Sequence, residues 1–305
     1  MDDEVFRSQL VSREALRMLA QRSDAPGLVR FGAHLALIAA LLALAILLRG
    51  TAWQILALWA EGVALVFLFA PLHETIHRTA FRQRWLNDAV AWLCGAVIML
   101  PPEYFRAFHF AHHRHTQDPA RDPELAKPKP RTLRGWLWYL SGLPYWIAEI
   151  KTTLRQALGH ADDGFIPARS KPRVVIEARI LWTLYLALAV GSAAFRSDLL
   201  LVYLVAPLLL GMPALRGYLM AEHTGCALGP DMLANSRTTT TNILVRFLAW
   251  NMPFHAEHHG WPAVPFHALP TVHRLIAPGL RCRGAGYVSV ARNILSYPTQ
   301  GVAPG

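Results

Sequence analysis

Four long apolar runs dominate the pattern of hydrophobic and polar positions along the chain. They cover residues 31–48, 52–72, 178–195 and 199–215, and they contain very few charged side chains. Crossing the roughly 30 Å hydrocarbon core of a bilayer takes about 20 mostly apolar residues, so each run can form a membrane-spanning helix. Three residues separate the first run from the second, and three separate the third from the fourth. Such short turns predict two helical hairpins.

The distribution of arginine and lysine predicts how these hairpins are oriented. The amino-terminal segment and residues 73–177 are rich in both, whereas the short turns hold one arginine each, Arg49 and Arg196. Because positively charged loops stay on the cytoplasmic side, both termini, residues 73–177 and residues 216–305 are expected there. The predicted fold is an all-α integral membrane protein with a cytoplasmic helical cap, forming one domain over residues 1–305.

A weaker apolar stretch, residues 85–100, is interrupted by polar side chains and ends at Pro101 and Pro102. It is short for a span, and a full crossing would place the histidines before and after it on opposite sides of the membrane. We therefore expect a re-entrant or interfacial helix. The Trp- and Tyr-rich residues 131–150 are expected at the lipid headgroups, and residues 4–20 as an amphipathic surface helix.

Composition supports a membrane protein, since 53% of the residues are hydrophobic and only 16% are charged. The net charge of +10 is explained either by anionic lipid headgroups or by an acidic electron carrier. Nucleic acid is not an expected partner, because no basic stripe is interleaved with aromatic residues away from the membrane-flanking segments. The three cysteines form no CxxC pair, so neither a disulfide framework nor an iron–sulfur or rubredoxin site is expected. The amino terminus does not resemble a cleaved signal peptide.

Histidine is the most informative residue type, because nine of the 14 histidines fall in three tight clusters and one isolated position. Spacings of three and four residues place such side chains on one face of a helix. One four-coordinate zinc needs three or four protein ligands, whereas two six-coordinate irons can use eight or nine nitrogens. The pattern therefore predicts a dinuclear iron centre. Its expected ligands are the clustered histidines His73, His77, His109, His112, His113, His255, His258 and His259.

The clusters have the sequences HETIH at residues 73–77, HFAHH at 109–113 and HAEHH at 255–259. In letters, order and spacing they resemble the three histidine boxes of the membrane fatty acid desaturase and hydroxylase superfamily. That resemblance implies two irons, dioxygen as co-substrate, and attack on an unactivated C–H bond of a lipid or acyl chain. It also implies one further histidine between the second and third boxes, which is His223 in the segment EHTG.

Several polar residues beside the boxes are candidates for supporting the centre. Glu74, Glu257 and Asn251 are expected to hydrogen-bond to ligands or to orient a water molecule, and so is Glu222. His115 follows the second box on another helical face, and we expect it outside the ligand set.

The other polar residues are given structural roles, with one exception. The acidic side chains after the second box, Asp118, Asp122 and Glu124, are expected to pair with Arg106 and Arg114. Plain structural roles are also expected for His34, His160, His267 and His273. The exception is Glu61, which is costly in hydrocarbon and should face the bundle interior or mark the substrate path.

Two reaction outcomes stay open at this level. The second and third boxes favour desaturation, whereas HETIH and EHTG favour hydroxylation; desaturation is the preferred prediction. HETIH also matches the HExxH signature of zinc metalloproteases, with Glu74 as general base, but that alternative leaves the other clusters without a purpose. A transporter or membrane scaffold would carry more polar residues within the spans.

An oxygen-activating centre also needs electrons. No haem-binding HPGG segment is present in the chain, so a separate ferredoxin, rubredoxin or cytochrome b5-type donor is expected.

Overall fold

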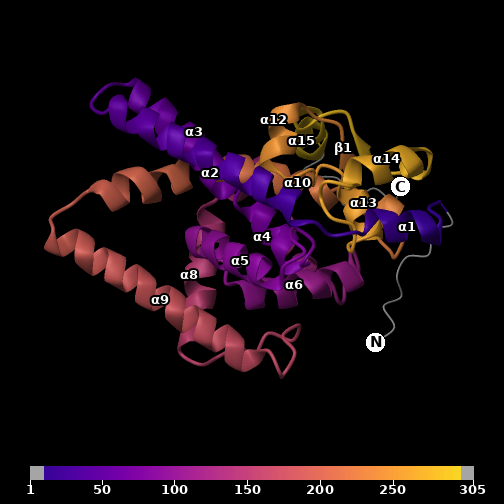
Figure 1. The fold of residues 1–305 in the computed structure, drawn as a ribbon, viewed down its shortest axis with the longest axis horizontal. Helices are drawn as coiled ribbons and strands as arrows, with labels where there is room; N and C mark the ends of the chain where they lie inside the picture. Colours follow the sequence, from indigo (N-terminus) through magenta and orange to yellow (C-terminus); the bar gives the residue numbers. More distant parts are fainter. Residues whose placement is uncertain (1–9, 297–305) are drawn as a thin grey trace.

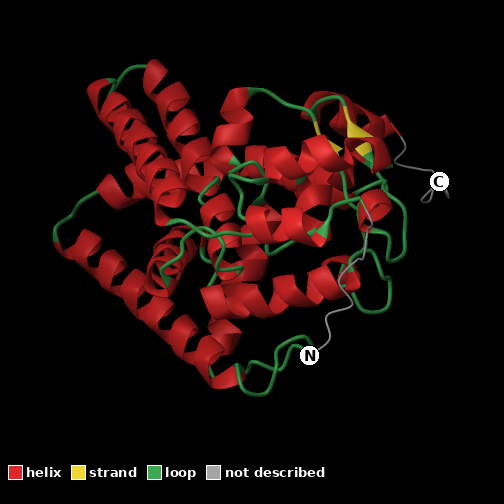
Figure 2. Cartoon of the chain, turned by 45° about the vertical axis from the view of Figure 1, so that its right-hand side comes forward, coloured by secondary structure: helices red, strands yellow, loops and turns green. Residues whose placement is uncertain are grey.

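The computed structural model describes residues 10–296, which form a mostly helical molecule (Figures 1 and 2). The helices of the amino-terminal half are α1 (Arg13–Leu19), α2 (Asp24–Leu47), α3 (Trp53–Val66), α4 (Phe69–Ile76), α5 (Arg84–Ile98), α6 (Pro102–His115), η1 (Pro123–Ala126), α7 (Leu133–Leu140) and α8 (Leu143–Ala157). Those of the carboxy-terminal half are α9 (Lys171–Ala194), η2 (Leu201–Val205), α10 (Ala206–His223), α11 (Met232–Asn235), α12 (Ile243–Leu248), α13 (His255–Gly260), α14 (Leu269–Ile276), η3 (Ala277–Gly279) and α15 (Tyr287–Ser296). Two short strands, β1 (Thr238–Thr239) and β2 (Arg283–Gly284), pair in parallel.

Four helical segments are long and apolar enough to cross a membrane, which confirms the four predicted spans. They are Asp24–Leu47, Trp53–Ile76, Lys171–Ala194 and Leu201–His223. Each of them runs several residues beyond the predicted limits at one end, because a helix continues until it is capped and not merely while its side chains are apolar. In the second and fourth spans this is the end that carries a histidine. His73 and His223 therefore lie at the ends of spans.

The first and third spans expose most of their apolar surface. Within their most apolar stretches only 17% and 22% of the residues are buried against protein, compared with 67% for Trp53–Ile76. Large apolar side chains such as Leu47 and Leu186 point outward. This exposure is what lipid contact requires, since water would penalise so large an apolar surface.

The second span is the centre of the bundle and packs against both α2 and α10. Gly62 of α3 meets Gly211 of α10 so closely that a Cβ atom at Gly62 would lie 1.9 Å from the Pro207 carbonyl oxygen. Only glycine allows the two backbones to approach to this distance.

The two predicted hairpins differ in how their helices pack. In the first, α2 contacts α3, whereas in the second α9 packs mainly against α8 and opens away from the helix that follows it (Figure 1).

A sharp bend of 95° separates α5 from α6. Met99 adopts a left-handed backbone conformation with φ 57°, and the Leu100 N–H donates to the Gly95 carbonyl at 2.8 Å, which closes α5. Pro101 and Pro102 then start α6 in a new direction, since proline at the first helical turn costs no hydrogen bond. The expected helix over residues 85–100 is present, and the bend returns α6 toward α4.

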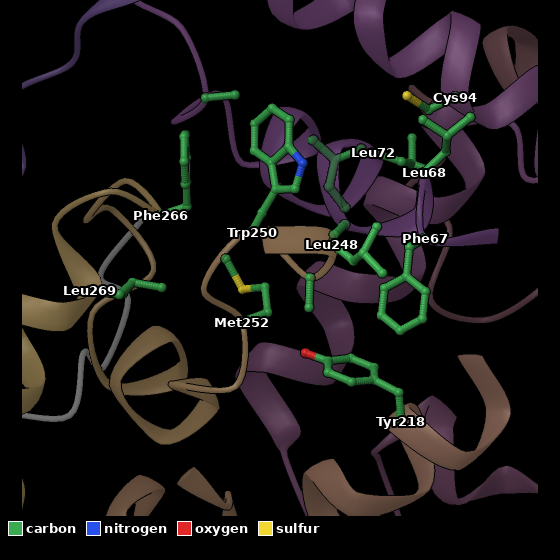
Figure 3. Close-up of a cluster of buried hydrophobic side chains, with 14 of the residues drawn as sticks. Phe67, Leu68, Leu72, Cys94, Tyr218, Leu248, Trp250, Met252, Phe266 and Leu269 are labelled. Atoms are coloured by element: carbon green, nitrogen blue, oxygen red, sulfur yellow. The ribbon is translucent and has the colours of Figure 1, made fainter. Parts of the chain in front are cut away.

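The main hydrophobic core joins the second span to the carboxy-terminal segment (Figure 3). Trp250 is fully buried, its ring centroid is 4.6 Å from that of Phe266, and Phe67 packs against Tyr218 at 5.3 Å. Trp250 and Asn251 both have positive φ angles, of 49° and 59°, and form the turn directly before α13. The core thereby fixes where the third histidine cluster begins.

A disulfide joins Cys226 to Cys282, so the expectation that the cysteines form no disulfide was wrong. The two residues are 56 positions apart, and neither lies in a spacing motif. They meet because β2 pairs with β1 and the Thr238 N–H donates to the Cys282 carbonyl at 3.2 Å. Only the tertiary fold brings these loops together.

Of the amphipathic helix expected over residues 4–20, the described residues form only the seven-residue α1, which begins after residues 10–12 and whose first turn is capped by the Ser12 hydroxyl. Residues 4–9 lie outside the described residues.

Candidate metal centre

All nine predicted ligands converge in one buried region, although they come from four separate parts of the chain. The first box lies at the end of α4, the second on α6, His223 on the last turn of α10, and the third box on α13. The 95° bend before α6 turns the second box toward the first. The side chains divide into two groups.

The first group contains five histidines whose ligand atoms all lie within 4.8 Å of one another: His73, His77, His109, His113 and His258. The Nε2 atoms of His73 and His109 are 2.6 Å apart, those of His113 and His109 are 2.9 Å apart, and those of His258 and His113 are 3.1 Å apart. Such convergence of imidazole nitrogens on one point is typical of a metal site.

The second group contains His112, His223 and His259, again within 4.8 Å of one another. His112 Nε2 lies 3.1 Å from His223 Nε2, and His255 Nε2 lies 2.8 Å from the same His223 atom. His255 therefore joins this group as a fourth imidazole. The two groups touch through the stacked rings of His113 and His259, whose centroids are 4.1 Å apart.

Hydrogen bonds to Nδ1 orient three imidazoles of the second group. His112 Nδ1 lies 2.9 and 3.1 Å from the Asp122 carboxylate oxygens, and His223 Nδ1 lies 3.1 Å from the Asn235 carbonyl oxygen. His259 Nδ1 lies 3.1 Å from the Thr116 hydroxyl. A partner on Nδ1 fixes the ring and leaves Nε2 to face the metal.

The donor set fits a pair of metal ions. The Nε2 atoms of His77 and His259 are buried and have no hydrogen-bond partner among the described residues. Burial, with a smaller effect of the Arg106 charge, lowers the pKa of His77 to about 3, and burial likewise lowers the pKa of His258 and His259 far below the usual range. These three imidazoles are therefore neutral at physiological pH, which is the form that binds metal.

Three of the four residues predicted to support the ligands hold the surrounding loops instead. Glu74 accepts from the Phe266 N–H at 2.9 Å, and Asn251 donates to the Phe266 carbonyl at 3.0 Å. Glu257 accepts from the Thr238 hydroxyl and contacts His273 Nδ1, both at 2.5 Å. The Glu74 oxygen that is bonded, Oε1, is therefore directed at this loop.

The acidic residues expected to pair with Arg106 and Arg114 have other partners. Asp122 binds His112, and Glu124 binds Lys129 with Oε1 at 2.9 Å from Nζ. The remaining residue, Asp118, pairs with Arg121 at the loop surface. These roles were missed because the Asp-Pro-Glu sequence after the second box belongs to no general motif. Its only signal is an acid close to a histidine cluster.

The charge environment of Glu124 keeps its carboxylate ionised. Burial alone would raise its pKa, but the Lys129 ammonium and His112 overcome this and hold the pKa well below its usual range. Glu222 lies 3.4 Å from His255 Nδ1 without forming a hydrogen bond.

The remaining histidines stand apart from both groups among the described residues, as predicted. His34 Nε2 contacts the Ala64 carbonyl oxygen at 2.9 Å, and His273 contacts Glu257. His115 ends α6 outside the ligand set. Glu61 is only 1% exposed and faces the bundle interior, as one of the two expectations for it required.

Comparison with known proteins agrees with this geometry. The family model described as fatty acid desaturase matches residues 51–291, which is most of the chain. The chain belongs to the fatty acid desaturase family. Sphingolipid delta(4)-desaturase/C4-monooxygenase DES2 of Rattus norvegicus is 28% identical over 245 residues, covering 76% of this chain and 69% of the relative. Beta-carotene ketolase of Haematococcus lacustris is 26% identical over 245 residues, covering 76% and 67%.

Membership of the fatty acid desaturase family identifies the protein as a lipid desaturase-like oxidoreductase. The chemistry that the family supports is desaturation or hydroxylation.

Proposed function

We propose that this protein uses two iron ions and dioxygen to insert a double bond into the alkyl chain of a lipid. The observation that carries the proposal is the pair of buried imidazole groups, five histidines beside four, at the end of an apolar bundle. Nine imidazole nitrogens exceed what one zinc ion can use and suit two six-coordinate irons.

Iron is needed because the C–H bonds of an alkyl chain are too strong for acid–base catalysis, and reduced iron can activate dioxygen. Desaturation removes two hydrogen atoms from neighbouring carbons, and with two electrons and two protons from a donor the oxygen leaves as two water molecules. The chain's own part is to hold the ligands through Asp122, Asn235 and Thr116 and to exclude water from the buried centre.

The substrate proposal follows from the apolar spans and from the relatives. Spans that meet at the histidines allow an alkyl chain to reach the centre from within the membrane. The rat relative is named both a desaturase and a monooxygenase, and the algal relative is named a ketolase. Hydroxylation by the same site is accordingly the second candidate, with HETIH and EHTG in its favour.

Three further elements complete the proposal. Both termini and the centre face the cytoplasm, where the basic loops lie. Two hairpins and a helical cap form one domain over residues 1–305. Electrons come from a separate ferredoxin, rubredoxin or cytochrome b5-type protein.

The first test is metal analysis of anaerobically purified, detergent-solubilised protein. About two irons per chain are expected from the donor set. One zinc per chain, persisting after reconstitution with ferrous iron, would refute the proposal.

In the second test the protein is given a lipid substrate, a reduced electron donor and dioxygen, and the mass of the product is measured by mass spectrometry. A product lighter by two hydrogens supports desaturation, and one heavier by a single oxygen supports hydroxylation. His112→Ala should abolish either reaction and lower the iron content; normal iron in this variant would contradict the ligand assignment.

A further inference from the structure

The two histidine groups are unequal, and this leaves one metal position short of a protein ligand. Five imidazoles form the first group, whereas the second contains His112, His223, His259 and the adjoining His255. A six-coordinate iron in the second group therefore has more open positions than one in the first. A side-chain oxygen beside the second group would reduce this difference in the number of protein ligands.

Glu124 lies beside the second group. Its Oε2 atom is 3.6 Å from His112 Nε2, the nitrogen that is also 3.1 Å from His223 Nε2. Two atoms bound to one metal ion at about 2.1 Å each lie about 3–4 Å apart, so 3.6 Å is a separation that shared coordination allows. Glu124 stands at the rim of the group, on the side of His112.

The local sequence holds this carboxylate in place. Asp122 accepts from the Glu124 N–H at 2.9 Å while it also binds His112 Nδ1, and Pro123 starts the short helix η1 between them. Asp122 and Glu124 thus flank the two nitrogens of the same imidazole. Lys129 binds the other carboxylate oxygen, Oε1, which leaves Oε2 facing the histidines.

We propose that Glu124 supplies an oxygen ligand to the metal ion of the second histidine group. The centre then has one iron bound by imidazoles alone and one bound by imidazoles and a carboxylate. A hard oxygen ligand favours the more oxidised iron, so the two ions differ in their electronic environment. This inference rests on the proposed function, because it requires that the histidine groups bind iron.

A purely structural role for Glu124 is the competing explanation, since the ion pair with Lys129 could only position the loop. Lys129→Met separates the two explanations, because it breaks the ion pair but keeps the carboxylate. Glu124→Gln keeps the shape and removes the charged ligand. Glu103→Gln is the matched control, as Glu103 is a largely buried carboxylate on α6 that contacts Ser170 and Arg173 instead of histidines.

The experiment compares these full-length variants in detergent after loading with ⁵⁷Fe. The readouts are iron content, the rate of iron loss to a chelator, and the Mössbauer spectrum, with gel filtration as the check of folding. Glu124→Gln should lose one of its irons at least about tenfold faster than the wild type, since even indirect partners of a metal affect affinity by 10–100-fold. One spectral component should change while the other stays constant.

Glu103→Gln should keep both irons and both spectral components, and Lys129→Met, which retains the Glu124 carboxylate, should lose iron more slowly than Glu124→Gln. The proposal is overturned if Glu124→Gln matches the wild type in all three readouts, or if Lys129→Met and Glu124→Gln lose iron equally. A wild-type protein that binds no iron after reconstitution would instead refute the proposed function, so the two failures are distinguishable.

Discussion

Asp122 gives the sharpest test of how the protein orients its metal ligands. Its buried carboxylate contacts His112 Nδ1 at 2.9 and 3.1 Å and accepts from the Gln117 N–H at 2.9 Å. Asp122→Ala leaves these two buried donors without an acceptor. Each such donor costs about 1–3 kcal/mol, so the variant should lose about 2–6 kcal/mol of folding stability.

The same change should weaken metal binding. Partners of metal-bound histidines contribute about 10–100-fold in affinity, which corresponds to about 1.4–2.8 kcal/mol. Asp122→Asn keeps a hydrogen-bond acceptor, and its effect on both quantities should therefore be smaller. Iron affinity is measured by competition with a chelator, and stability by thermal unfolding in detergent.

Asp118→Ala is the control, because Asp118 lies in the same loop but pairs with Arg121 at the surface. It should leave iron affinity at the wild-type value. If Asp122→Ala binds iron as tightly as Asp118→Ala does, then the hydrogen bond to Nδ1 does not orient His112, and the argument fails.

Three other changes test separate parts of the structure. Gly62→Ala should destabilise the bundle by at least about 3 kcal/mol, because the added Cβ would collide with backbone atoms. Gly32→Ala places its Cβ in open space and should leave the stability unchanged, and thermal unfolding compares the two variants. Cys226→Ser opens a crosslink spanning 56 positions and should cost about 4 kcal/mol, so an unfolding temperature equal to that of the wild type under non-reducing conditions would contradict the disulfide. His258→Ala should abolish turnover and lower iron content, while His267→Ala should leave both intact, as measured by product mass and metal analysis.

The sequence was sufficient for the spans and the histidines because both have strong local signals. Apolar runs of membrane length need no tertiary information, and imidazoles at spacings of three and four residues share a helix face. Eight histidines could therefore be named from spacing before their positions in space were known, and His223 from the resemblance to the desaturase family. How they divide into five and four could not, because that division depends on the bend between α5 and α6.

The residues around the ligands were harder to predict because their partners are distant in sequence. Glu74, Glu257 and Asn251 were predicted to support the metal ligands because they lie close to the histidine boxes in the sequence. Each instead forms a hydrogen bond with a loop that only the fold brings near. Asp122 and Thr116, which do orient imidazoles, lie close to the second box but follow no spacing rule. Cys226 and Cys282 meet for the same reason, through the pairing of β1 with β2.

The scatter of the ligands along the chain has a consequence for biogenesis. The first ligand is His73 and the last is His259, so most of the polypeptide must be synthesised before the set exists. The second group in particular combines His112 with α13, which packs in the same core as Trp250. Iron therefore enters a nearly finished protein. A chain that stalls before residue 255 can insert its helices in the membrane, but it offers no complete site for the metal.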